Sequence, residues 1–479
     1  MPSIELHLPF DTSIDLIALA DVLGAVAVTV HVLLKKYDVR AAIGWIGLAW
    51  LSPFIGAALY YVFGINRVMR RAARLTPESP DEPTPVPISV PTESQALPEN
   101  ILTIARVGAQ LTGHSLVLGN SISLFSDGDE AYPAMLDAIA AAQRSIILAS
   151  YIFRKDRVGG AFIDALSRAR RRGVEIRVLV DGIGSGYMRS RAADELRRAD
   201  IKVARFMHYW LPWRMPFLNM RNHKKLLVVD GSVGFSGGLN IGVENLRRSP
   251  VGFPVTDVHF RLKGPVVAQL MLTFAEDWKF TTGEVLTGEL WLPHIAPSGS
   301  VAARGISSGP DEDMGKLELV LAAAVAAAKQ KLRIVTPYFL PEQRLMAALV
   351  LAALRGVQVE IVIPERSDHI VLDWAMRAHL GFFTVPGLTV YLSHRPFDHS
   401  KLVTVDGVWC ALGSPNWDVR SLRLNFEFLV ECYGVEAAAE VDRLIDRKVE
   451  HARPIPPLAT RSLALRLRDA GARLLLPYL

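Results

Sequence analysis

The chain carries the same strand, helix and strand pattern twice. In the first copy, residues 145–153 and 174–182 have the composition of buried strands, and residues 159–173 between them have the periodicity of an amphipathic helix. The second copy repeats this order over residues 332–365. A duplicated unit of this kind predicts an α/β fold with two halves, each a mixed sheet flanked by helices, related by a pseudo-twofold axis.

Each copy is followed by the polar pattern HxKxxxxD, with a glycine-rich turn and an asparagine at the same distance behind it. A single match to so short a pattern carries little weight, but two matches with identical spacing do not arise by chance. Equivalent residues of a duplicated pair can meet at the axis, so the sequence predicts one site built from both copies. Its members are His223, Lys225, Asp230, Gly237, Gly238 and Asn240 from the first copy, and His399, Lys401, Asp406, Gly413, Ser414 and Asn416 from the second.

Two imidazoles and two ammonium groups in one pocket suit the transfer of a phosphodiester. One histidine can attack phosphorus and form a covalent phosphohistidine, while the other protonates the leaving alkoxide and later deprotonates the incoming hydroxyl. Lys225 and Lys401 would neutralise the phosphoryl oxygens, and Asn240 and Asn416, with the neighbouring backbone at Ser414, would donate hydrogen bonds to the developing charge. The sequence contains no cluster typical of metal ligands, so no metal or other cofactor is expected.

The N-terminal part of the chain predicts a membrane anchor. Residues 41–66 carry no charged side chain, and as a helix roughly 23 of them would span about 35 Å, more than the bilayer core of about 30 Å. Residues 14–34 are also apolar but include two aspartates and a histidine, so this segment either spans the membrane or only dips into it. We expect residues 1–70 to form a hairpin of two membrane helices, over residues 14–34 and 41–64.

The remaining composition predicts a linker, two domains and a tail. Residues 71–100 begin with arginines and continue into a proline-rich, acidic stretch, which is typical of a mobile linker. We expect the first α/β domain at 101–290 and the second at 291–455. Residues 456–479 have leucines near helical spacing with arginines between them, which predicts an amphipathic tail that lies on a membrane or packs on the body. The formal net charge of +5 suits an anionic partner, either phospholipid headgroups or nucleic acid.

The duplicated motif resembles that of the phospholipase D superfamily. The segments 41–64, 128–153, 334–343 and 421–427 are similar to those of bacterial cardiolipin synthases. This resemblance implies that a phosphatidyl group is transferred between two phosphatidylglycerol molecules to give cardiolipin and glycerol. It also implies a multi-pass protein of the bacterial inner membrane with its catalytic body in the cytoplasm. Phosphatidylglycerol, cardiolipin and the membrane are then the partners rather than nucleic acid, and a homo-oligomer is compatible with the site but not required.

The resemblance also assigns roles to individual residues. It makes His223 and His399 the nucleophile and the acid–base pair, with His223 as the nucleophile. It places Glu427 where a carboxylate orients the second-copy histidine, and Asp257 as the counterpart for the first copy. Such a buried acceptor fixes the histidine tautomer.

Three further motif positions carry expectations of their own. Asp230 and Asp406 complete the two motifs and are expected to be structural, bonding backbone or lysine near the strand end. Gly238 departs from the family's pattern, which usually has serine there, but the change removes no reactive group.

Other functions are compatible with the same residues. A phospholipase D, or a phosphatidyltransferase with a different acceptor, would use the same site with water or another alcohol. A nuclease of the superfamily is disfavoured by the membrane segment and by the lack of a groove combining aromatic and basic residues. A lipid-binding scaffold without activity is disfavoured because both motifs are intact.

Overall fold

The computed structural model describes residues 12–36, 39–52, 54–64, 97–208, 220–249, 253–310, 313–455 and 461–474. The described residues belong to two units, a group of N-terminal helices and an α/β body. Most of the linker expected at 71–100 lies outside the described residues, which resume at residue 97.

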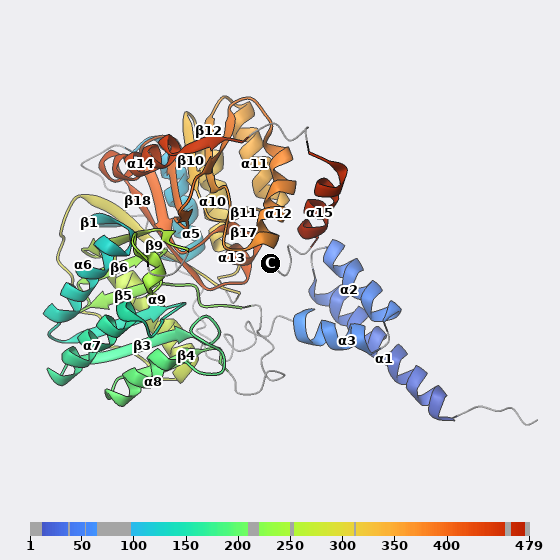
Figure 1. The fold of residues 1–479 in the computed structure, drawn as a ribbon, viewed down its shortest axis with the longest axis horizontal. Helices are drawn as coiled ribbons and strands as arrows, with labels where there is room; N and C mark the ends of the chain where they lie inside the picture. The colour runs from blue at the N-terminus through green and yellow to red at the C-terminus, as the bar shows by residue number, and fades with distance from the viewer. Residues whose placement is uncertain are drawn as a thin grey trace, which may run out of the picture. The chain divides into compact units, whose positions relative to one another are not determined.

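One mixed sheet of fifteen strands forms the centre of the α/β body (Figure 1). Its strands follow the spatial order β19, β13, β12, β10, β15, β16, β18, β9, β1, β8, β6, β5, β2, β3, β4. The first half of the body provides β1 (Val117–Ser126), β2 (Ser145–Ser150), β3 (Glu175–Asp181), β4 (Lys202–Phe206), β5 (Leu226–Val229), β6 (Val233–Gly237) and β8 (Val258–Lys263). The second half provides β9 (Val301–Ser308), β10 (Lys331–Val335), β12 (Gln358–Pro364), β13 (Leu388–Ser393), β15 (Leu402–Val405), β16 (Trp409–Gly413), β18 (Glu427–Tyr433) and β19 (Ala452–Pro454).

The pairing pattern of one half repeats in the other. β3 lies parallel between β2 and β4, as β12 lies parallel between β10 and β13. On the other side of β2 and β10, the antiparallel series β5–β6–β8–β1 corresponds to β15–β16–β18–β9. The halves join where β1 pairs with β9. The predicted α/β duplication is therefore confirmed, and the two expected sheets are joined edge to edge into one.

Two pairs of short strands complete the body. β7 (Val255–Thr256) of the first half pairs in parallel with β14 (Phe397–Asp398) of the second. β11 (Phe339–Leu340) pairs in parallel with β17 (Trp417–Asp418), both in the second half. The β7–β14 pair matters for function because it ties the segment before His399 to the first half.

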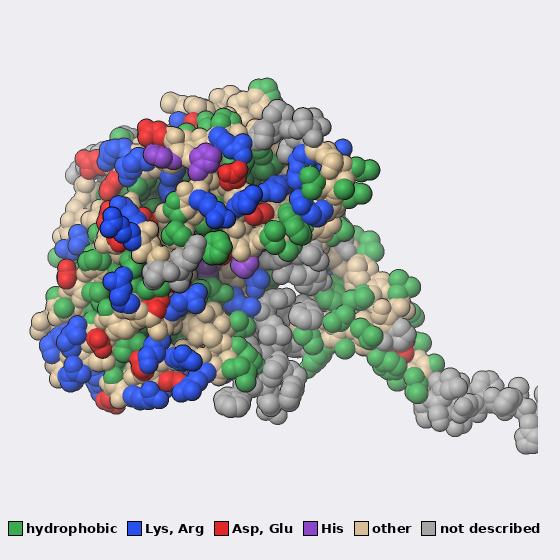
Figure 2. All heavy atoms as spheres, viewed as in Figure 1, with side chains coloured by type: hydrophobic (Ala, Val, Ile, Leu, Met, Phe, Trp, Pro, Cys, Tyr) green, Lys and Arg blue, Asp and Glu red, His purple; other side chains and the backbone are tan. Residues whose placement is uncertain are grey.

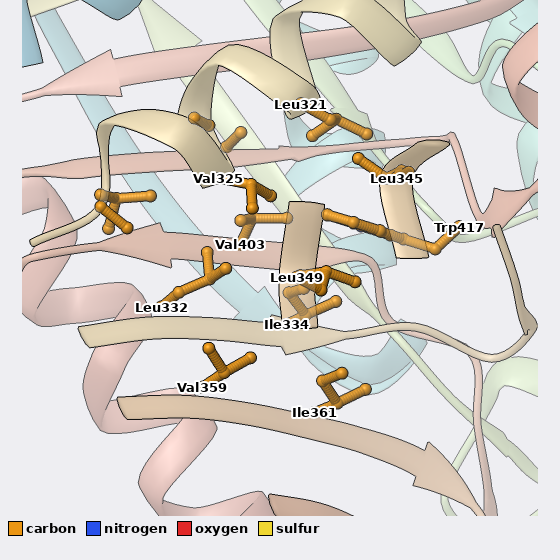
Figure 3. Close-up of a cluster of buried hydrophobic side chains, with 14 of the residues drawn as sticks. Leu321, Val325, Leu332, Ile334, Leu345, Leu349, Val359, Ile361, Val403 and Trp417 are labelled. Atoms are coloured by element: carbon orange, nitrogen blue, oxygen red, sulfur yellow. The ribbon is translucent and has the colours of Figure 1, made fainter. Parts of the chain in front are cut away.

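Helices cover both faces of the sheet, which explains why its central strands are buried on both sides. Residues Leu332, Ile334 and Val403 pack under α10 and α11 (Figure 3), whereas Arg333, between two of them, faces α14 and pairs with Asp442. Each fully buried Leu or Ile contributes roughly 1.5–3 kcal/mol. The helices of the body are α6 (Asp127–Ala141), α7 (Arg157–Arg171), α8 (Arg191–Arg198) and α9 (Val267–Thr282) in the first half, and α10 (Lys316–Ala327), α11 (Gln343–Leu354), α12 (Ile370–His379), α13 (Val419–Arg423) and α14 (Val435–Glu450) in the second, with the 3-10 turns η3 (Val243–Asn245) and η4 (Leu380–Phe383).

Helix α5 (Glu99–Thr112) precedes the first half in the chain but packs in the core of the second. Its buried Ile101, Ile104 and Ala105 belong to the same apolar cluster as Leu317 and Leu321 of α10. The expected first domain, starting at residue 101, therefore includes a helix that belongs by packing to the second. The physical reason is that the apolar face of α10 needs a partner, and α5 supplies it.

The N-terminal unit contains α1 (Thr12–Lys35), α2 (Val39–Leu51), α3 (Ile55–Leu59) and the π-helical turn η1 (Tyr60–Gly64). Among the described helices, only the stretch Ile17–Lys35 of α1 is long and apolar enough to cross a membrane. The expected second spanning helix over residues 41–64 is interrupted after Leu51, where Pro53 follows two residues later and lacks the N–H that a helix needs. At about 1.5 Å per residue, α2 falls short of a bilayer core, so the expectation of a multi-pass protein is not supported.

The expected C-terminal tail contains one described helix, α15 (Leu463–Arg473). It packs against α12 of the second half. The residues before position 461 and after position 474 in this tail lie outside the described part of the chain.

Candidate active site

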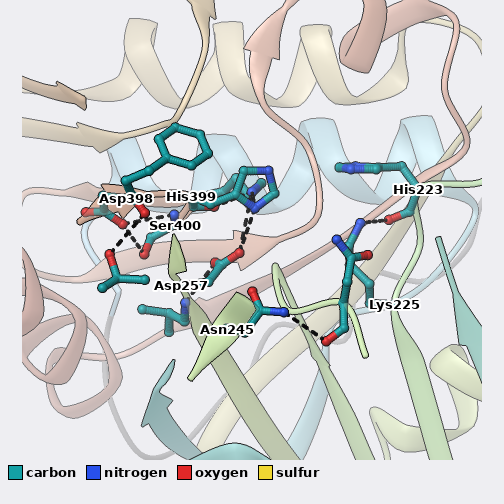
Figure 4. Close-up of polar contacts among 12 residues, drawn as sticks. His223, Lys225, Asn245, Asp257, Asp398, His399 and Ser400 are labelled. Carbon is teal, nitrogen blue, oxygen red and sulfur yellow. Dashed lines mark hydrogen bonds and ion pairs between the residues drawn. The ribbon is translucent and has the colours of Figure 1, made fainter. Parts of the chain in front are cut away.

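His223 and His399 meet at the junction of the two halves (Figure 4). His223 lies just before β5, and His399 lies between β14 and β15. Their ring centroids are 6.4 Å apart, and their side chains are 10% and 13% exposed. The motifs of the two copies thus form one largely buried site, as the duplication predicts.

Each histidine is held by a carboxylate from the other half. Nδ1 of His223 lies 3.1 Å from Oε2 of Glu427, and Nδ1 of His399 lies 2.7 Å from Oδ2 of Asp257. The expected pairing of Glu427 with the second-copy histidine and Asp257 with the first is wrong, because each histidine reaches across the junction. When Nδ1–H donates to the carboxylate, Nε2 keeps its lone pair free for chemistry.

The backbone of each histidine is anchored across the junction in the same way. The N–H of His223 donates to the carbonyl of Phe426 at 2.8 Å, and the N–H of His399 donates to the carbonyl of Thr256 at 2.7 Å. Each of these carbonyls belongs to the residue directly before the carboxylate that holds the same histidine. Two consecutive residues of one half therefore fix both the backbone and the ring of the other half's histidine.

A buried ion pair ties each motif to the helix behind it. Lys224, in the first motif, pairs with Asp277 of α9 at 3.0 Å. In the second copy the charges are exchanged: Asp398, directly before His399, pairs with Lys448 of α14 at 2.7 Å. Breaking such a pair leaves an uncompensated buried charge, so these contacts hold the motif segments in place.

Lys225 and Lys401 lie beside the two histidines. Nζ of Lys225 donates to the carbonyl of His223 at 2.6 Å, and Nζ of Lys401 donates to the carbonyl of His399 and lies 3.8 Å from Oδ2 of Asp257. Burial lowers the pKa of both ammonium groups, that of Lys225 to about 7. Two partly desolvated cations thus stand where phosphoryl charge would be neutralised.

Burial also lowers the pKa of both histidines. The pKa of His223 falls to about 4, although Glu427 opposes the shift. The pKa of His399 is lowered by burial and by Lys401, while Asp257 opposes the shift. Burial alone would raise the pKa of the two carboxylates, but their cationic neighbours hold both below their usual range. The imidazole of His223 is therefore neutral at neutral pH, and the two carboxylates are charged.

The structure adds site residues that the sequence patterns did not single out. Tyr151, directly after β2, packs edge-on against His223 with ring centroids 5.0 Å apart. Tyr338, just before β11, packs in the same manner against His399 at 6.3 Å. Each tyrosine follows the first strand of its own β–α–β unit, so aligning the two copies of the repeat was the signal that could have identified them. Glu427 also accepts hydrogen bonds from the side chains of Ser421 and Asn425, at 2.8 and 3.2 Å.

Asp230 and Asp406 lie outside this pocket. Asp230 accepts hydrogen bonds from three successive backbone N–H groups, of residues 143–145, and Asp406 from those of residues 329–331. Both residues have a positive φ, 51° and 52°. They fix the turns before β2 and β10 at the far ends of the motif strands, so they take no part in the pocket although the motif contains them.

The three residues expected to bind phosphate have different surroundings. The amide oxygen of Asn240 accepts a hydrogen bond from the N–H of Ile152 at 3.2 Å. The amide oxygen of Asn416 is buried and has no hydrogen-bond partner in the described part of the chain. Ser414 instead donates its hydroxyl to Glu427. The structure therefore assigns the Ser414 side chain to holding the carboxylate rather than to binding phosphate.

Gly238 and Ser414 are equivalent residues in the two copies. Gly238, which has no side chain, lies beside the aspartate Asp257, and Ser414 lies beside the glutamate Glu427. The N–H of each donates, at 3.0 Å, to the carbonyl of the residue after that carboxylate. A Cβ atom on Gly238 would lie 2.1 Å from Oδ1 of Asp257. The shorter aspartate thus reaches into the space that a serine side chain fills beside Glu427, which explains the departure at Gly238.

Gly238→Ser is expected to lower kcat/KM by about 10²-fold, because the serine displaces Asp257 and with it the ring of His399. Adding Asp257→Glu to the same chain should restore most of the loss, since this pair reproduces the Ser414–Glu427 arrangement. The measurement is kcat/KM for the single and double variants relative to the wild type. Gly160→Ser, where nothing lies within 4 Å of the new Cβ, is the control. A double variant no better than Gly238→Ser would contradict the account.

Two motifs that meet at the junction of duplicated α/β halves define an enzyme of the phospholipase D superfamily. The family model for the cardiolipin synthase, PLD-like domain matches residues 135–278 and 321–449. The chain belongs to the cardiolipin synthase family and is a phosphatidyltransferase of this superfamily.

Curated relatives match over nearly the whole chain. The cardiolipin synthase of Geobacillus thermodenitrificans is 31% identical over 448 residues, which cover 91% of this chain and 88% of the relative. Cardiolipin synthase A of Pseudomonas aeruginosa is 32% identical over 470 residues, covering 96% and 94%. Among solved structures, the phosphatidylserine synthase of Haemophilus influenzae superposes with a TM-score of 0.61 at 15% identity, covering 78% of this chain and 100% of that one. The last match confirms the fold alone.

Proposed function

We propose that this enzyme makes cardiolipin by transferring a phosphatidyl group from one phosphatidylglycerol molecule to a second, through a phosphohistidine at His223. The observation that carries the proposal is the facing pair of His223 and His399, each with Nδ1 on a carboxylate and a buried lysine beside it. The relatives named as cardiolipin synthases support the choice of substrate.

In the first step, Nε2 of His223 attacks the phosphorus of the donor lipid. An N–P bond forms, the bond between phosphorus and the glycerol headgroup oxygen breaks, and that oxygen takes a proton from His399. Free glycerol leaves. We assign the attack to His223 because burial lowers its pKa to about 4, so its imidazole is unprotonated at neutral pH.

In the second step, a headgroup hydroxyl of the acceptor phosphatidylglycerol replaces His223 on phosphorus. The now neutral His399 takes the hydroxyl proton, the oxygen forms the new P–O bond, and the N–P bond breaks. Cardiolipin leaves, and both histidines return to their starting states, so glycerol is the sole co-product.

The surrounding residues balance charge during both steps. Lys225 and Lys401 neutralise the phosphoryl oxygens, and the amides of Asn240 and Asn416 donate hydrogen bonds to them. Because one chain supplies both halves of the site, the reaction needs no oligomer. We place the enzyme in the bacterial inner membrane with its body on the cytoplasmic side, which fits the bacterial relatives and the apolar α1.

A phospholipase D activity is the second candidate. The two catalytic rings are 10% and 13% exposed, so water can also reach the phosphohistidine and release phosphatidic acid. A different alcohol as acceptor would use the same geometry.

The test is to incubate the purified full-length protein with phosphatidylglycerol in EDTA and to identify the lipid products by mass spectrometry. Cardiolipin with an equal amount of glycerol is the expected result, since the lysines take the place of a metal. Phosphatidic acid as the main product would instead identify a phospholipase D activity. The absence of any turnover would contradict both candidate functions.

A bell-shaped dependence of kcat/KM on pH is expected, because kcat/KM reports the ionisation of the free enzyme. His223 must be neutral, so activity is lost as pH falls through about 4. Lys225 must be charged and His399 must be protonated as the acid. The pKa of Lys225 is about 7 and burial lowers the pKa of His399 below its usual value, so activity is lost by the time the pH has risen to about 7. The profile measured from pH 3 to 10, about one unit below the lower limb and about three units above the upper one, checks this. An optimum above pH 9, more than about two units past the Lys225 limb, would contradict the assignment.

A further inference from the structure

Helix α15 is fixed to the α/β body through one of its sides. Asp469, only 2% exposed, forms ion pairs with Arg461 and with Arg468, the latter at 2.8 Å. The guanidinium of Arg468 lies 4.5 Å from the ring centroid of Trp374 on α12, and Ala472 is buried on the same side. The cation–π contact with Trp374 and the burial of Ala472 in the apolar core of the second half therefore dock the helix.

The opposite side of α15 is apolar and faces outward. Leu463, Leu467 and Leu474 are 69%, 64% and 75% exposed. They are four and eleven residues apart, a spacing that puts them on one face of a helix with 3.6 residues per turn. A helix on a water-exposed surface normally turns its leucines inward, so this orientation is the reverse of the usual one. A single exposed leucine is common on a protein surface, but these three leucines form a continuous apolar strip along one face of the helix.

The charges on α15 fit an anionic partner. Arg466 and Arg473, seven residues apart, follow one border of the leucine face. Asp469 is the one acidic residue between positions 463 and 474, and it is buried and paired with arginines. Figure 2 shows hydrophobic and basic side chains next to each other over this helix. Leucines bordered by arginines are typical of helices that lie in the interface of an anionic bilayer.

The position of α15 links this face to the active site. The helix packs on α12, which begins directly after His369. The ring of His369 lies 6.3 Å from that of Tyr338, and Tyr338 packs against the catalytic His399. The first residue of α12, Ile370, is itself 63% exposed. A surface that engages lipid at α15 would therefore hold the second half of the site close to the bilayer.

We propose that α15 is an interfacial membrane contact, with Leu463, Leu467 and Leu474 at the level of the upper acyl chains and Arg466 and Arg473 among anionic phospholipid headgroups. This contact is separate from the membrane anchor provided by α1. It holds the second half of the site close to the surface that contains the lipid substrate. The inference does not depend on which phospholipid reaction the site performs.

The experiment places an environment-sensitive fluorophore at position 467 of the full-length protein through Leu467→Cys. The two native cysteines, Cys410 and Cys432, are buried and so do not compete for the label. The protein is reconstituted into phosphatidylcholine vesicles with and without phosphatidylglycerol, in each case with and without lipids brominated in the acyl chains. The same label at Asp164→Cys, on an exposed position of α7, is the matched control.

A blue-shifted emission and at least twofold quenching by the brominated lipid are expected at position 467 in vesicles with phosphatidylglycerol, with neither effect at position 164. Arg466→Glu combined with Arg473→Glu should reverse both effects. A label at 467 that aqueous iodide quenches and brominated lipid does not would overturn the proposal. A blue-shifted label at 467 that neither brominated lipid nor aqueous iodide quenches would also overturn it, because another part of this chain or a second copy would then cover the face. The readout needs no turnover, so it stands apart from the test of the proposed function.

Discussion

His223→Ala is expected to abolish phosphatidyl transfer, lowering kcat by at least about 10⁴-fold, because no covalent intermediate can form. On the proposed mechanism, His399→Ala removes the group that protonates the leaving glycerol oxygen, so kcat should fall by about 10²–10⁴-fold. The two losses differ in kind, since the first removes the nucleophile and the second a proton donor.

A phosphatidyl ester with a p-nitrophenol headgroup separates the two roles. Its leaving group needs no proton, so His399→Ala should still release a burst of p-nitrophenol that is stoichiometric with the enzyme. His223→Ala should release none. His451→Ala, an exposed histidine bonded to the carbonyl of Arg447, is the control and should behave as the wild type. A burst from His223→Ala and none from His399→Ala would exchange the two assignments.

Lys225→Gln and Lys401→Gln are each expected to lower kcat by about 10²–10³-fold, the usual loss when one preorganised group that stabilises transition-state charge is removed. The phosphoryl oxygens carry more negative charge in the transition state than in the bound lipid, so kcat should fall more than KM rises. Burial makes the effect large, because water cannot take over the role of the ammonium.

Steady-state kinetics on mixed micelles of phosphatidylglycerol measures this loss, with thermal unfolding as a check that the variants fold. Lys155→Gln is the matched control, since Lys155 is 45% exposed and pairs with Glu195 at the surface. A lysine variant that keeps more than about a tenth of the wild-type kcat would show that the site stabilises charge in another way.

Most of the fold could be predicted from the sequence repeat alone. Because HxKxxxxD occurs twice with one spacing, both the duplicated α/β architecture and the meeting of His223 with His399 could be predicted. The partners of these histidines could not. Glu427 and Asp257 were recognisable as carboxylates, but which histidine each one reaches depends on how the halves associate, and no local pattern encodes that contact.

Outside the site, two expectations differ from the structure for two different physical reasons. Ile101 and Ile104 mark an apolar helix face, yet their partner α10 lies about 200 residues later in the chain, so the sequence offered no means of assigning α5 to the second half. In the N-terminal unit, hydropathy favoured one long helix over residues 41–64. Instead, α2 ends at Leu51, because a proline such as Pro53 lacks the N–H that would continue the helix.

The covalent intermediate is the central claim, and trapping it is the most direct test. The full-length protein is mixed with phosphatidylglycerol, quenched at alkaline pH within one turnover, digested and examined by mass spectrometry. The account predicts a phosphatidyl group on His223, present in the wild type and absent from His223→Ala. Modification of His399 instead, or cardiolipin formed without modification of either histidine, would contradict it.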